Sequence, residues 1–128
     1  MNTNNFKILV AEDEEINFLY IDILIKKEYP HLQIIHAKNG QEAVDFCKSD
    51  AQIKLVFMDI KMPVMNGYEA TNLIKKLNNH LPIVALTAYS TDDDKKQAMQ
   101  TGFIDFLTKP INKKKFLTII KDNLPSSN

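Results

Sequence analysis

The most constraining feature of this chain is an apolar run that ends at a carboxylate. Residues 53–59 read Ile-Lys-Leu-Val-Phe-Met-Asp, and Pro63 and the Asn66-Gly67 pair then prevent a regular continuation. A nearly continuous apolar run of this length is typical of a strand covered on both faces of a parallel sheet. Asp59 is therefore predicted at the carboxyl end of a buried strand, where open α/β sheets place their ligands.

Four more runs repeat this pattern, and amphipathic stretches separate them. The predicted strands cover residues 6–11, 33–37, 53–59, 83–87 and 103–108. Five strands that alternate with five helices imply a parallel sheet with right-handed crossovers and helices on both faces. The simplest solution is an α/β fold with a doubly wound, five-stranded parallel sheet in the order 2-1-3-4-5, which is flavodoxin-like.

The helical stretches also predict which side chains are buried. The helix after the first strand is predicted to bury the stripe Ile16, Leu19, Tyr20, Ile23 and Leu24. The helix after Gly67 is predicted to bury Ala70, Leu73, Ile74 and Leu77. The helix at residues 91–101 offers only Ala98 and Met99 as apolar anchors, so we expect it to be the least firmly packed.

Composition narrows the class of protein. The 128 residues fit one domain at 6–124, with a disordered N-terminus at 1–5 and a C-terminal tail at 125–128. Sixteen basic and sixteen acidic residues balance, which argues against direct nucleic-acid or membrane binding. The first residues show no basic region followed by an apolar stretch, and no apolar run approaches the length needed to span a bilayer. The single Cys47 suits a reducing compartment, so we expect a cytoplasmic domain.

The predicted strand order brings distant polar residues together. Strands one and three are neighbours, so their carboxyl ends place Glu12, Asp13 and Asp59 side by side. Strand four adds Thr87 and strand five adds Lys109 at the same edge. Three adjacent carboxylates repel one another unless one takes up a proton or a cation binds. All-oxygen ligands favour magnesium, manganese or calcium over zinc or copper.

This arrangement suits phosphoryl chemistry. A carboxylate such as Asp59 can attack phosphorus and form an aspartyl phosphate. A divalent cation, the Lys109 ammonium and the Thr87 hydroxyl would hold the three equatorial oxygens of the transferred group. The three histidines, His31, His36 and His80, are scattered along the chain, and we expect ordinary solvated or half-buried roles for them.

Four segments carry a family resemblance: VAEDEEIN at 10–17, FMDIKMPVMNGYEAT at 57–71, PIVALTA at 82–88 and GFIDFLTKPI at 102–111. Residues 6–124 resemble a response-regulator receiver domain of two-component signalling. The wording of the motifs is most similar to receivers of hybrid histidine kinases and phosphorelays. Both a free-standing regulator and a segment of a larger kinase fit this resemblance.

The resemblance implies roles for individual residues. Asp59 would accept the phosphoryl group, and Mg²⁺, or alternatively Mn²⁺, would be bound by Asp13, by Glu12 directly or through water, by Asp59, and by the backbone carbonyl of Lys61. Thr87 and Lys109 would contact the phosphoryl group.

Further positions carry over in the same way. Phe106 would act with Thr87 as the switch pair, and phenylalanine lacks the tyrosine hydroxyl, so such a switch works by packing alone. The Lys109–Pro110 peptide is expected to be cis. Lys61 and Tyr89 would flank the path of water and modulate hydrolysis of the phosphoryl group.

The implied function is that of a signalling phosphoacceptor and not of a conventional enzyme. It would take phosphoryl from a histidine kinase or histidine-phosphotransfer domain, catalyse only its own phosphorylation and slow dephosphorylation, and act as a monomer or weak dimer. Whether it signals by a conformational switch or only relays phosphate stays open. The alternatives are a pseudo-receiver, a metal-dependent phosphatase, which would want an acid where Lys61 stands, and a flavodoxin-like redox protein, which would want a glycine- or serine-rich phosphate loop.

Overall fold

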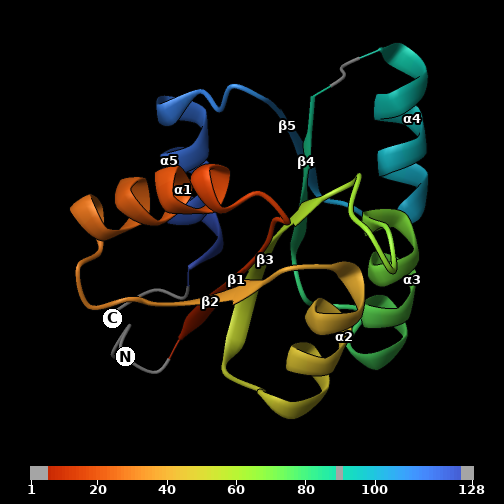
Figure 1. The fold of residues 1–128 in the computed structure, drawn as a ribbon, viewed down its shortest axis with the longest axis horizontal. Coiled ribbons are helices and arrows are strands. Elements are labelled where there is room, and N and C mark those ends of the chain that lie inside the picture. The colour runs from red at the N-terminus through yellow and green to blue at the C-terminus, as the bar shows by residue number, and fades with distance from the viewer. Residues whose placement is uncertain (1–5, 89–90, 125–128) are drawn as a thin grey trace.

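The protein was analysed as a computed structural model, which describes residues 6–88 and 91–124. The strands are β1 (Lys7–Ala11), β2 (Gln33–Ala37), β3 (Ile53–Asp59), β4 (Ile83–Thr87) and β5 (Asp105–Thr108). The helices are α1 (Glu15–Glu28), α2 (Gly40–Ser49), α3 (Gly67–Leu77), α4 (Asp92–Thr101) and α5 (Lys113–Asn123). The strands form one parallel sheet in the order β2-β1-β3-β4-β5, which confirms the predicted fold class (Figure 1). Tyr89 and the predicted terminal segments lie outside the described residues.

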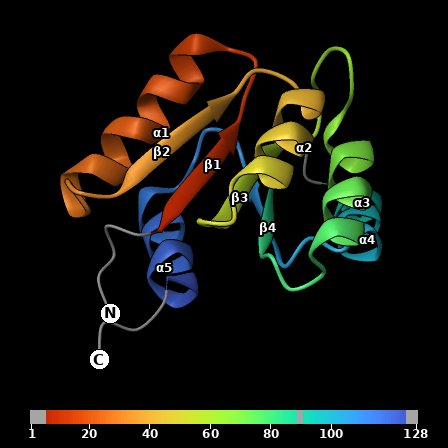
Figure 2. The ribbon, with the colours of Figure 1, turned by 90° about the horizontal axis from the view of Figure 1, so that it is seen from below.

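The sheet separates two helical layers. Helices α1 and α5 cover one face, and α2, α3 and α4 cover the other (Figure 2). Within β3, Leu55 and Phe57 pack in the layer of α1 and α5, whereas Val56 and Met58 pack in the opposite layer. All four side chains are fully buried. Because each face of the central strand meets helices, the strand reads as a continuous apolar run.

Local sequence signals start four of the helices. Asn39, Asn66, Thr91 and Asn112 are N-caps whose side chains each accept a hydrogen bond from a backbone N–H in the first helical turn. Asn66 belongs to a capping box, since the Glu69 side chain in turn accepts from the Asn66 backbone N–H at 3.3 Å. These caps fix where the loops above the sheet end.

The buried face of α1 differs from the prediction. Four residues of the predicted stripe are exposed, namely Ile16 (81%), Leu19 (46%), Tyr20 (46%) and Ile23 (54%). Leu24 is buried as predicted, and the helix also buries Ile21 and Ile25 against the sheet and α5. The segment EINFLYIDILIKKE carries two overlapping apolar stripes, so periodicity alone selects neither, and the sheet takes the second.

The buried faces of α3 and α4 match the prediction only in part. Ala70 and Ile74 are buried as predicted, whereas Leu73 and Leu77 are 39% and 49% exposed. Helix α3 lies close against α2, so small residues such as Ala70 occupy the contact and the larger leucines point outward. In α4, Ala98 is the only buried residue and Met99 is 57% exposed, consistent with a weakly anchored helix. Among the described residues, no helix is long and apolar enough to span a bilayer.

Candidate functional site

The ends of β1 and β3 bring the acidic residues together. The two strands pair in parallel with Ala11 opposite Met58, so Glu12 and Asp59 emerge next to each other. Carboxylate oxygens of Glu12, Asp13 and Asp59 all lie within 4.8 Å of one another. Glu12 is fully buried, Asp59 is 5% exposed, and Asp13 lies at the surface.

The ends of β4 and β5 complete the site. Thr87 lies opposite Thr108 in the sheet, and the backbone N–H of Lys109 donates to the Thr87 carbonyl at 2.8 Å. The Lys109 side chain turns toward the acids, where Nζ donates to Glu12 Oε1 at 2.7 Å and to Asp59 Oδ2 at 2.9 Å. The other oxygen of Asp59, Oδ1, accepts from the Lys61 backbone N–H at 3.2 Å. The Lys109–Pro110 peptide is cis.

The electrostatics of the site follow from burial and this lysine. The pKa of Glu12 is raised from 4.5 to about 7, chiefly because burial disfavours the charged form; the hydrogen bond from Lys109 opposes this rise, and the charge of Asp59 adds to it. Burial tends to lower the pKa of Lys109, but its bonds to Glu12 and Asp59 outweigh burial and raise it. Lys109 therefore remains a cation between two acids. When Glu12 and Asp59 are both ionised, their two negative charges exceed the single positive charge of Lys109.

Two glycines hold the loop that follows Asp59 against the rest of the fold. Gly67 donates its N–H to the Ile60 carbonyl at 2.8 Å, and a Cβ at this position would lie 2.3 Å from the Asp59 carbonyl oxygen. Gly40, at the start of α2, donates to the Met65 carbonyl at 3.0 Å, and a Cβ there would lie 2.3 Å from the same oxygen of Met65. At this separation a side chain at either position would force the neighbouring backbone to move.

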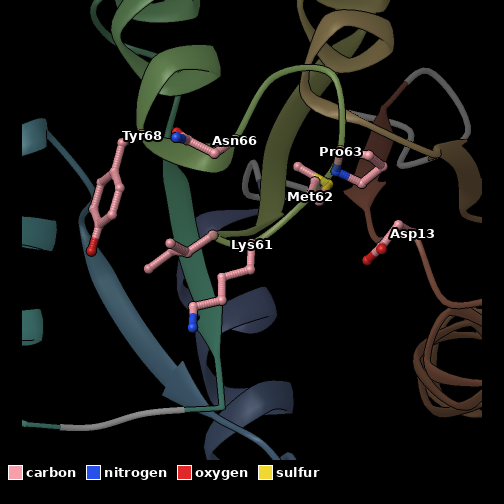
Figure 3. Close-up of a pocket in the computed structure, with 7 residues that line it drawn as sticks. Asp13, Lys61, Met62, Pro63, Asn66 and Tyr68 are labelled. Atoms are coloured by element: carbon pink, nitrogen blue, oxygen red, sulfur yellow. The ribbon is translucent and has the colours of Figure 1, made fainter.

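Two hollows open beside the acids. One of about 210 Å³ is lined by Asp59, Thr87 and Lys109 together with Asp13, Glu14, Lys61 and Ala88. A second, of about 480 Å³, lies between Asp13 and the β3–α3 loop, where Met62, Pro63 and Tyr68 supply apolar walls (Figure 3). The side chains of Asp59, Thr87 and Lys109 therefore share one hollow at the end of the sheet.

The remaining predicted site residues lie around this centre. Phe106 is 8% exposed and packs in the same apolar cluster as Ala98 of α4. Lys61 lies at the surface on the loop after Asp59, and Tyr89 is outside the described residues.

Sequence reasoning missed one neighbour of the site. His36, on β2, lies with Nε2 2.7 Å from the Glu12 carbonyl oxygen, and its ring stacks on Phe18 of α1. The register of β2 on β1 indicates this contact, because His36 is paired with Val10, which lies two residues before Glu12.

Comparison with known proteins agrees with this fold and site. The family described as "response regulator receiver domain" matches residues 8–121. Hybrid signal transduction histidine kinase I of Dictyostelium discoideum is 35% identical over 126 residues, which cover 92% of this chain and 7% of that kinase. The chain thus spans a small part of the kinase's length.

Among the solved structures that resemble the chain, two are receiver domains of signalling proteins. The receiver domain of Saccharomyces cerevisiae Ssk1, crystallised with the histidine phosphotransfer protein Ypd1, has a TM-score of 0.82 at 33% identity, covering 93% of this chain and 88% of that one. The receiver domain of the Pseudomonas aeruginosa sensor histidine kinase PA1611, with a magnesium ion in its active-site cleft, has a TM-score of 0.83 at 28% identity, covering 94% and 98%.

The doubly wound sheet and the acidic centre define a receiver-type signalling domain. This chain belongs to the response regulator receiver domain family of two-component and phosphorelay systems. The resemblance to receivers of hybrid histidine kinases and phosphorelays is confirmed.

Proposed function

We propose that this domain accepts a phosphoryl group on Asp59 from a phosphohistidine partner and that the transfer requires Mg²⁺. The observation that carries the proposal is the acidic cluster of Glu12, Asp13 and Asp59, with Lys109 hydrogen-bonded to two of its members. An Asp59 oxygen attacks phosphorus, a P–O bond forms, and the P–N bond to the donor imidazole breaks. The electron pair of that bond returns to the imidazole nitrogen, which takes up a proton.

The donor set of the cluster fits a hard divalent cation. Glu12, Asp13 and Asp59 offer carboxylate oxygens only, and the Lys61 backbone carbonyl is the fourth proposed ligand. When bound, Mg²⁺, or alternatively Mn²⁺, would supply charge stabilisation for the phosphoryl oxygens. Lys109, which the two acids keep protonated, places a second positive charge beside Asp59, and the Thr87 hydroxyl is the proposed hydrogen-bond donor on the third side.

The partner is proposed to dock on α1. Ile16, Leu19, Tyr20 and Ile23 form an exposed apolar patch, here termed the α1 patch, on a helix that begins two residues after Asp13. Exposed apolar groups gathered beside a reactive site are typical of protein interaction surfaces. The Ssk1 receiver, a structural relative, is found with the phosphotransfer protein Ypd1, which supports a partner of that kind here.

The docking proposal has a matched test. Leu19→Asp should slow phosphotransfer from a phosphorylated histidine-phosphotransfer domain at least tenfold, because a charge then replaces apolar contact. Leu77→Asp changes an equally exposed leucine at the far end of α3 and should leave the rate unchanged. Equal rates for both variants would reject the α1 patch as the docking surface. A wild-type domain that accepts no phosphoryl from phosphohistidine would reject the proposed function itself.

Phosphorylation is proposed to switch the α4–β5 region. A phosphoryl group on Asp59 adds acceptor oxygens, toward which the Thr87 hydroxyl moves, and Phe106 then repacks in the space beside β4. Helix α4 buries only Ala98, so it is the element most easily displaced. Amide chemical shifts with and without beryllofluoride test this step. Shifts confined to the loops around Asp59, with α4 silent, would leave a phosphate relay without a switch.

A further inference from the structure

His36 on β2 contacts both α1 and the turn at Glu12 and Asp13, which carries two of the proposed metal ligands. Its Nε2 lies 2.7 Å from the Glu12 carbonyl oxygen, and a carbonyl only accepts, so Nε2 carries the proton and donates. Its ring stacks on Phe18 with the two centroids 3.8 Å apart and the planes 5° from parallel. One side chain of β2 thus contacts both the backbone of the turn and the first turn of α1.

The backbone of Glu12 is held by β2 on both sides of its Cα. Its N–H donates to the Ala37 carbonyl at 3.0 Å, and its carbonyl accepts from His36. That carbonyl belongs to the peptide that joins Glu12 to Asp13, so its orientation sets the direction in which Asp13 leaves the turn. Asp13 lies at the surface, where packing restrains its side chain little, and the backbone therefore governs where its carboxylate lies.

We propose that His36 is a positioning residue for the cation site: its hydrogen bond to the Glu12 carbonyl holds the Glu12–Asp13 peptide in the orientation that keeps both carboxylates close to Asp59. The proposal rests on the proposed function for the identity of the cation. Groups that orient metal ligands typically contribute 10- to 100-fold to metal affinity. His36 acts through the backbone of the ligands and not on a ligand atom, so we expect about tenfold.

Three substitutions separate the contribution of the His36 N–H donor from that of its ring. His36→Phe keeps a ring for Phe18 and removes the N–H, whereas His36→Gln keeps a donor near the position of Nε2 and removes the ring. Phe18→Leu weakens the stack and leaves the hydrogen bond. Affinity for Mn²⁺ is measured by electron paramagnetic resonance, with Mg²⁺ competition and no phosphodonor. We expect His36→Phe to bind about tenfold more weakly, His36→Gln to recover most of the loss, and Phe18→Leu to bind like wild type.

A metal-free measurement provides a second readout. Amide hydrogen exchange at Glu12 should be faster in His36→Phe than in His36→Gln, because the N–H···O bond to Ala37 opens more often once the turn is released. Urea unfolding shows whether each variant is folded, and if His36→Phe is not, His36→Gln against His36→Leu carries the same comparison.

The outcomes distinguish the positioning role of His36 from the proposed cation site itself. Unchanged Mn²⁺ affinity in folded His36→Phe, with wild type binding normally, overturns the positioning role alone. Equal weakening in His36→Phe and His36→Gln also overturns it, because the donor then contributes nothing. Failure of the wild-type domain to bind either cation overturns the proposed cation site and the positioning role together.

Discussion

Replacing Glu12 by glutamine isolates the cost of ionising a buried acid in the metal-free domain. Glu12 is fully buried, and its pKa rises from 4.5 to about 7 chiefly because burial disfavours the charged form. A raised pKa in the folded state means that the stability associated with the protonated acid is present below pH 4.5 and is lost as pH rises through about 7. Glutamine resembles the protonated acid in shape and carries no charge at any pH.

The magnitude follows from the two pKa values. Each pKa unit corresponds to about 1.4 kcal/mol, so ionised Glu12 lowers the free energy of unfolding by about 3 kcal/mol at pH 9. At pH 5 folded Glu12 is mostly protonated, and the same cost is only about 1 kcal/mol. Glu12→Gln should therefore be more stable than wild type, by an amount that grows over this range.

Urea unfolding in the presence of chelator measures this difference. The advantage of Glu12→Gln should rise between pH 5 and pH 9, and Mg²⁺ should reduce it by stabilising wild type. Asp13→Asn is the matched control, because it removes one charge from the same cluster at the protein surface and not from a buried position. A Glu12→Gln advantage that stays constant with pH, or a loss of stability at pH 9, would refute the reasoning.

Four further substitutions test the loop after Asp59 and the lifetime of the phosphoryl group. Gly67→Ala should lower the free energy of unfolding by about 2–3 kcal/mol in urea, because its Cβ would meet the Asp59 carbonyl at 2.3 Å, and a neutral result would mean that the loop yields freely. Val64 is 82% exposed with φ of 69°, so Val64→Gly should raise stability by about 0.5–1 kcal/mol, and a loss would show that this backbone is unstrained. Lys61→Ala and Tyr89→Ala should each speed hydrolysis of the phosphorylated domain several-fold in a phosphate-release assay; if neither does, these side chains do not obstruct water.

The strand order and the acidic centre were predictable because they depend on strong, local signals. The apolar run into Asp59 and the similar run before Glu12 define two buried parallel strands, and adjacency at the switch point of the sheet then brings the carboxylates together. Turn and cap residues such as Asn66 and Gly67 mark the loop that follows. Such features require no knowledge of how one helix packs on another.

Features that depend on tertiary packing were not predictable in this way. Helix α1 has two apolar stripes, and only contact with the sheet and α5 decides that Ile21 and Ile25 are buried while Ile16 is exposed. His36 was expected to be an ordinary solvated or half-buried residue, and it is half-buried. Its contact with the Glu12 carbonyl depends on the register of β2 against β1, which the strand order alone does not set. The pairing of Lys109 with both Glu12 and Asp59 depends on side-chain direction, which the strand order alone does not set.

The proposed function requires that Asp59 accept a phosphoryl group and that the acidic cluster hold a divalent cation during the transfer. The direct measurement is intact-protein mass after incubation with acetyl phosphate, with Mg²⁺ or with chelator, for wild type and Asp59→Asn. We expect a mass increase of one phosphoryl group in wild type with Mg²⁺, none with chelator, and none in Asp59→Asn under either condition. An equal increase in Asp59→Asn, or an increase in wild type that persists with chelator, would contradict the proposed function.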